Sequence, residues 1–196
     1  MNFCSGRSYL LIFIFSFLAC AASAQQDISR YEDFELNESE LYWRFIYTYS
    51  GSADSLRKAV SQLLRNKTFT QNVIRTETGY TGELSHYRVN CKRYGRKYTN
   101  TLRMYWEGNW KGKFKVEVKE GRYRVTIYGL YYEINTPPDY KHTPQGPMKG
   151  KYIDVLCGKD YTCFRKSELG HMPLMNIALK DEFDIKNLKA ASADDW

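Results

Sequence analysis

The sequence predicts an α+β fold in which an antiparallel sheet carries helices on one face. Three observations support this fold class. Apolar and polar residues alternate over most of the region 40–135, as they do in strands with one buried face. The segment 53–65 changes to the helical period of 3.6 residues. The segment from 172 onwards contains apolar residues without a clean period, and we expect one or two C-terminal helices there.

The first 24 residues have the features of a secretory signal peptide. Arg7 precedes an apolar run over residues 10–22 and the small triplet Ala22-Ser23-Ala24, so we expect cleavage after Ala24. The apolar run is shorter than the roughly 20 residues that span a membrane. A second interpretation is a lipoprotein signal in which Cys20 is lipidated. We therefore expect an exported protein, in the periplasm or outside the cell, which the second interpretation would anchor in the outer membrane.

The chain without this leader is basic. Removal of Arg7 leaves 28 Lys and Arg residues against 22 Asp and Glu residues, a net charge of +6. Such a balance often indicates nucleic-acid binding. Export argues against that class, because an exported protein rarely meets its own nucleic acid. Anionic glycans, lipid headgroups and envelope proteins remain as possible partners.

The first elements of the core can be placed by their periodicity. Residues 25–39 are polar, and we expect a loose lead-in. In the segment 41–49, aromatic residues alternate with other residues, as in a strand. Ser52 is the expected N-cap of the helix 53–65, and Asp54 suits the positive end of its dipole. The apolar face of this helix comprises Leu56, Ala59, Val60, Leu63 and Leu64.

Further strands are expected after this helix. The segments 70–79 and 81–95 alternate and are separated by a Gly-Tyr-Thr-Gly turn. In the segment 98–108, Leu102, Met104 and Trp106 alternate with polar residues, which predicts another strand.

The segment 115–129, KVEVKEGRYRVTIYG, predicts a hairpin that turns at Glu120-Gly121. This turn sets Val118 opposite Tyr123 and Val116 opposite Val125, so apolar side chains share one face. It also sets Glu117 opposite Arg124 on the other face. Tyr132 would continue the charged face if Gly129 is not a bulge.

The face turned away from the helix is the candidate binding face, because basic groups with interleaved aromatic rings can hold an anionic ligand that contains rings. The alternative is a solvated sheet face whose lysines block aggregation. The candidate residues are Arg88, Lys92, Arg103, Lys115, Lys119, Arg122, Arg124 and Tyr128.

The C-terminal third is less regular. Residues 136–151 hold four of the five prolines, which predicts a loop. In the segment 152–196 we expect a short strand, a cysteine loop and the C-terminal helix or helices. Cys157 and Cys163 are spaced for a small disulfide loop in an oxidising compartment, or for two unlinked thiols. Cys91 is expected to be a buried thiol.

No motif in the sequence indicates a particular reaction. The three histidines, His86, His142 and His171, lie in no metal-binding pattern, and no Gly-rich loop precedes a helix. We expect no metal site and no cofactor. A pair of carboxylates that meet only in the folded protein could still support hydrolysis.

The chain resembles a family of secreted proteins of Gram-negative bacteria, a domain of unknown function with a TBP-like fold. The resemblance covers about Leu41 to Ile134 and rests on the helix at Leu56–Leu64 and on the segment VEVKEGRYRVTIYGLYYEI. It rests above all on Lys119, Gly121, Arg122, Tyr123 and Arg124. It implies a curved antiparallel sheet with helices on one face, and it implies no activity.

Together these features predict an exported binding or interaction module without enzymatic activity, whose ligand is unknown. Two alternatives stay open. One is an envelope hydrolase that uses a pocket with converging carboxylates, His142 or His171. The other is a structural subunit of an envelope assembly, for which an uncovered apolar patch would be the sign.

Overall fold

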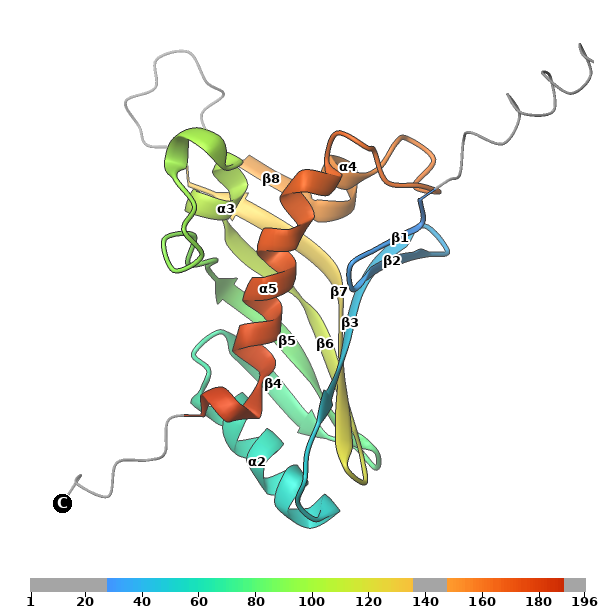
Figure 1. The fold of residues 1–196 in the computed structure, drawn as a ribbon, viewed down its shortest axis with the longest axis vertical. Helices are drawn as coiled ribbons and strands as arrows, with labels where there is room; N and C mark the ends of the chain where they lie inside the picture. The colour runs from blue at the N-terminus through green and yellow to red at the C-terminus, as the bar shows by residue number, and fades with distance from the viewer. Residues whose placement is uncertain (1–27, 136–147, 189–196) are drawn as a thin grey trace, which may run out of the picture.

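The computed structural model describes residues 28–135 and 148–188, in which eight antiparallel strands form one curved sheet (Figure 1). The strand order is β1-β2-β3-β7-β6-β5-β4, and β8 pairs with β7. The predicted α+β fold class is confirmed. The strands are β1 (Arg30–Tyr31), β2 (Phe34–Asn37), β3 (Glu40–Thr48), β4 (Thr70–Arg75), β5 (Gly79–Tyr87), β6 (Asn109–Lys119), β7 (Arg122–Ile134) and β8 (Met148–Lys151).

Two longer helices, α2 (Ala53–Asn66) and α5 (Met172–Phe183), pack on the same face of the sheet (Figure 1). Helix α2 begins as predicted, because the Ser52 side chain accepts a hydrogen bond from the Ser55 N–H. Its apolar face is buried, as the sequence period predicts. Shorter elements complete the fold: α3 (Arg103–Glu107), α4 (Tyr152–Leu156) and the 3-10 turns η1 (Tyr98–Asn100), η2 (Leu169–His171) and η3 (Ile185–Asn187).

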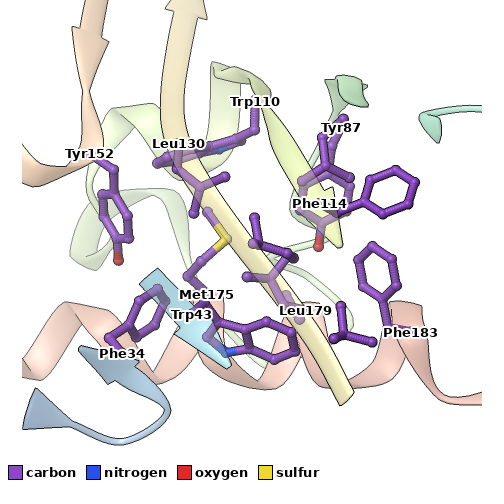
Figure 2. Close-up of a cluster of buried hydrophobic side chains, with 14 of the residues drawn as sticks. Phe34, Trp43, Tyr87, Trp110, Phe114, Leu130, Tyr152, Met175, Leu179 and Phe183 are labelled. Atoms are coloured by element: carbon purple, nitrogen blue, oxygen red, sulfur yellow. The ribbon is translucent and has the colours of Figure 1, made fainter. Parts of the chain in front are cut away.

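Helix α5 is fixed to the sheet by apolar packing and by specific hydrogen bonds. Figure 2 shows Met175, Leu179 and Phe183 of α5 among the aromatic side chains of the sheet. The buried indole of Trp43 donates to the Asn176 Oδ1 at 2.7 Å. The last carbonyls of a helix lack partners within the helix. Here the Tyr47 hydroxyl donates to the Lys180 carbonyl oxygen and the Tyr123 hydroxyl donates to the Phe183 carbonyl oxygen.

The hairpin of β6 and β7 has the predicted register. Val118 lies opposite Tyr123, Val116 opposite Val125, and Glu117 opposite Arg124. Gly121 in the turn has a φ of +69°, which glycine adopts more readily than other residues. This register separates the apolar face from the charged face from the turn as far as Lys113 and Tyr128.

The structure differs from the expected lead-in at residues 25–39. The described part, from residue 28, contains β1 and β2, and β2 pairs with β3. Phe34 is fully buried and packs edge-on against Tyr152. These strands have two and four residues, too few to show a period, so the polar composition concealed them.

The expected strand around 102–106 is instead the short helix α3. Arg103 pairs with Glu107 at 2.7 Å, one helical turn away, and the Gly108 N–H donates to the Met104 carbonyl oxygen. Met104 and Tyr105 are buried as neighbours in sequence. A strand would have sent them to opposite faces.

The C-terminal third also differs in detail. The expected short strand at 152–156 is helix α4, and a strand, β8, lies at the end of the expected proline loop. Cys157 and Cys163 are free thiols, so the expected disulfide is not formed, and Cys91 is the expected buried thiol. Residues 136–147, with His142, lie outside the described residues, as do the leader with Cys20 and Ala24 and the end of the chain from 189. None of the described helices is long and apolar enough to cross a membrane.

Candidate functional site

The sheet surface turned away from α2 and α5 carries a band of basic side chains. We call it the outer face and define it by the outward residues of β3 from Tyr42 onwards, of β6 from Lys113 onwards and of β7 as far as Tyr128. Their alternation with buried residues follows from the pleat of each strand. The outer face comprises Tyr42, Arg44, Ile46, Thr48, Lys113, Lys115, Glu117, Lys119, Arg122, Arg124, Thr126 and Tyr128.

The structure brings five of the predicted site residues together on this face. Lys119 lies opposite Arg122, and Lys115 is a diagonal neighbour of Arg124 on the adjacent strand. The side chains of these four residues are exposed. Tyr128 is half-buried on the same face. Neighbouring strands are about 4.8 Å apart, and outward residues on one strand are about 6.8 Å apart. The cations therefore form a closely spaced array.

Three predicted residues do not belong to this face. Arg88 and Lys92 follow the end of β5, where the chain leaves the sheet, and the Arg88 Nε donates to the Asn109 Oδ1 at 2.8 Å. Arg103 lies in α3 and pairs with Glu107. Arg88 and Lys92 were assigned to the face by extending a strand period beyond the end of β5, and Arg103 because the segment of α3 was predicted to be a strand.

Gly129 is a bulge, so Tyr132 does not continue the outer face. The register between β6 and β7 shifts there, and Gly129 has a φ of +62°. Beyond the bulge, Tyr132 turns inward and packs on Trp110, with ring centroids 5.5 Å apart. Tyr131 points outward instead, opposite Lys111. Because of this single inserted residue, Tyr131 and not Tyr132 has its ring on the outward side of the sheet.

Glu117 is the central carboxylate of the outer face. Arg124 donates to it at 2.6 and 2.9 Å, and the Lys115 Nζ lies 3.2 Å from it. Burial acts to raise the pKa of Glu117, but the hydrogen bonds from Arg124 and Lys115 outweigh it and lower this pKa. Glu117 is therefore ionised at neutral pH and partly neutralises the face.

Sequence reasoning missed several members of the outer face on β3. Arg44 lies 4.7 Å above the Tyr42 ring and pairs with Glu35 at 2.7 Å. The Tyr42 and Tyr128 rings are 6.0 Å apart. The alternation in the segment 41–49 was the available signal, but only its aromatic face was used. The pairing of β3 with β7, which places these residues beside the hairpin, is a long-range contact that no local pattern shows.

The outer face also has one apolar position. Ile46 has 52% of its surface exposed and lies in a shallow hollow of about 150 Å³ that Arg122 and Arg124 also line. In the described part of the chain, no group of three or more His, Cys, Asp or Glu side chains is placed to hold a metal ion. The chemistry that the outer face supports is the binding of anions by cations and tyrosine rings.

Comparisons with known proteins give structural neighbours only. No protein family model and no curated protein matches the sequence. The chain is similar in structure to a TBP-like protein from Parabacteroides distasonis, with 11% identity, a TM-score of 0.44, and coverage of 79% of this chain and 97% of that one. It is also similar to a DUF4468 family protein from Bacteroides ovatus, with 11% identity, a TM-score of 0.39, and coverage of 85% and 100% respectively. The first of these has the TBP-like description that the sequence resemblance named.

Proposed function

We propose that this protein is an exported, non-enzymatic binding module whose outer face holds an anionic glycan. The observation that carries the proposal is the excess of positive charge on a sheet face that none of the described helices covers. Between the hairpin turn and the Gly129 bulge, the outer face has six cations and one carboxylate. The cations are Arg44, Lys113, Lys115, Lys119, Arg122 and Arg124.

The shape and composition of the face favour a glycan over the other anionic partners. A protein interface of standard kind has an apolar core, and the outer face of these strands has one strongly exposed apolar residue, Ile46. A long polyanion can instead follow the array of cations across several strands. The Tyr42 and Tyr128 rings offer apolar surface beside hydroxyl groups, which suits the mixed character of a sugar ring.

The envelope-subunit alternative would place its contact on the edge strand β4. Val73 and Ile74 are exposed there, with 37% and 64% of their surface accessible. The strand has a bulge between Gln71 and Ile74, with Asn72 at a φ of +52°. Such a bulge hinders pairing with another strand. We therefore favour the outer face as the binding surface.

The proposal can be tested by calorimetry with hexagalacturonate, which has one carboxylate per sugar ring, and with neutral maltohexaose. We expect the double variant Lys119→Glu/Arg122→Glu to weaken hexagalacturonate binding more than tenfold. The matched control is Lys58→Glu/Lys166→Glu, which makes the same change in net charge at exposed positions of α2 and of the segment before η2. Equal losses in both variants, or equal binding of the neutral sugar, would contradict the proposal.

A further inference from the structure

The sheet has a gap beside the bulge of β7. Strand β3 pairs with β7 as far as Tyr128, and β8 pairs with the same edge of β7 from Tyr131 onwards. Among the described strands, neither β3 nor β8 supplies a partner to Gly129 and Leu130. The missing pairing covers about 10 Å of strand, since each residue advances about 3.4 Å. A short stretch of the β7 edge is thus left open between the ends of two strands.

A pocket of about 600 Å³ occupies this gap. Its lining includes the apolar residues Leu41, Leu130 and Ile153, each with no more than 9% of its surface exposed. Gly129 leaves the gap unobstructed, because a Cβ atom built on it would meet no atom within 4 Å. The volume lies in the range of small-ligand sites, which are mostly apolar with a few oriented polar groups.

The pocket has one carboxylate at its β3 end. Glu40 lies there, and its Oε2 accepts the Tyr42 hydroxyl at 2.7 Å. Asp154 lies in α4, three residues after Lys151, and accepts the Tyr161 hydroxyl at 2.7 Å. Within the described residues, no basic side chain pairs with either carboxylate. Lys151 lies at the β8 end, opposite Tyr131. The pocket therefore offers the Glu40 carboxylate at the β3 end and the Lys151 ammonium group at the β8 end, where Lys149 also lines it and pairs with Glu133.

We propose that this gap binds a short extended peptide of two or three residues with free termini. A peptide of this length matches the open edge, since an extended chain spans at most about 3.3–3.6 Å per residue. Its backbone can pair with the open edge of β7, in the manner of strand addition to a sheet. Its ammonium group meets Glu40, its carboxylate meets Lys151, and an apolar side chain meets Leu41 and Leu130.

The charges also select the direction of the peptide. Its N-terminus lies at the β3 end and its C-terminus at the β8 end, so it runs parallel to β7. This inference is independent of the glycan proposal, because it depends on the gap and not on the cation array of the outer face.

Three probes with one apolar body test the inference on the whole mature chain: Leu-Leu, N-acetyl-Leu-Leu and Leu-Leu amide. We expect Leu-Leu to bind and to shift the NMR signals of Gly129, Leu130 and Lys151. Blocking either terminus removes a charge-assisted hydrogen bond, and we expect each blocked peptide to bind about tenfold more weakly. Three results would overturn the inference. They are equal affinity of the free and acetylated peptides, NMR shifts of other residues, and no binding at a peptide concentration of about 10 mM, which would place the Kd beyond the millimolar range.

Two variants locate the site. Gly129→Asn fills the gap with a residue that tolerates a positive φ, and it should abolish binding. Glu40→Gln keeps the acceptor for Tyr42 and should remove the preference for the free over the acetylated peptide, a readout that a general loss of folding does not mimic. The control is Glu120→Gln, in the hairpin turn at the far end of the sheet from β8, which should leave the preference unchanged (Figure 1). A preference that survives Glu40→Gln would overturn the assigned direction and site.

Discussion

Replacement of Glu117 by glutamine should strengthen glycan binding on the outer face and slightly weaken the fold. Glu117 accepts hydrogen bonds from Arg124 at 2.6 and 2.9 Å and forms an ion pair with Lys115 at 3.2 Å. The substitution removes the central negative charge of the array. It also releases two cations for the ligand.

The expected magnitudes follow from Coulomb's law and from measured surface ion pairs. A ligand carboxylate about 6 Å from Glu117 is repelled by about 0.7 kcal/mol in water, and by about 1.4 kcal/mol where protein halves the dielectric constant. Loss of this repulsion tightens binding about threefold to tenfold at low salt. Exposed ion pairs contribute at most about 1 kcal/mol to the free energy of unfolding. For a chain of this size, that corresponds to a fall in Tm of about 2–4 °C.

Calorimetry with hexagalacturonate at about 20 mM and about 150 mM salt measures the first effect, and thermal unfolding measures the second. The gain in affinity should shrink at the higher salt concentration because the exposed charges are screened. Glu182→Gln is the matched control, since Glu182 pairs with Lys67 on the helix side and the change in net charge is the same. Unchanged or weaker binding by Glu117→Gln, or equal gains in both variants, would refute the reasoning.

Three further predictions concern the fold and its titrating groups. Phe34→Ala should lower the free energy of unfolding by about 3–5 kcal/mol in urea denaturation, because Phe34 of β2 belongs to the core. A loss below about 1 kcal/mol would mean that this segment is a loose lead-in after all. Burial, with Cys163 nearby, raises the pKa of Cys157 to about 12, so this thiol is almost entirely protonated at pH 8. Maleimide reacts with the thiolate, and in the folded protein it should therefore label Cys163 before Cys157, as mass spectrometry can show. Hydrogen bonds from Lys111 and Lys149 lower the pKa of Glu133 to about 2. Glu133 therefore stabilises the fold above the pKa of the unfolded chain, and this contribution is lost as the pH falls through about 2. Lys111→Ala should raise the Glu133 pKa in an NMR titration, and an unchanged value would contradict the pairing.

The hairpin and helix α2 could be predicted because their patterns are local and long. Val116, Val118, Tyr123 and Val125 alternate over a run with one turn, so one register satisfies them all. Helix α2 repeats its apolar positions over several turns and has a capping serine. In both cases local sequence and tertiary burial agree.

The remaining features depend on contacts that no local pattern contains. Leu102, Met104 and Trp106 alternate in sequence, yet the segment is a short helix because its burial is decided by packing against the rest of the core. Gly129 is compatible with a regular strand or with a bulge, and the pairing with β6 decides between them. The outer face was therefore predicted at its centre, on the hairpin. Its extension onto β3 and the gap beside β8 required the sheet order.

The central claim is that the outer face holds an anionic glycan, and NMR titration of the ¹⁵N-labelled protein with hexagalacturonate tests it most directly. The account predicts that signals of Lys115, Lys119, Arg122 and Arg124 shift together and saturate, and that maltohexaose leaves them unchanged. Shifts confined to α2 and α5, or no shift at low salt, would contradict the account.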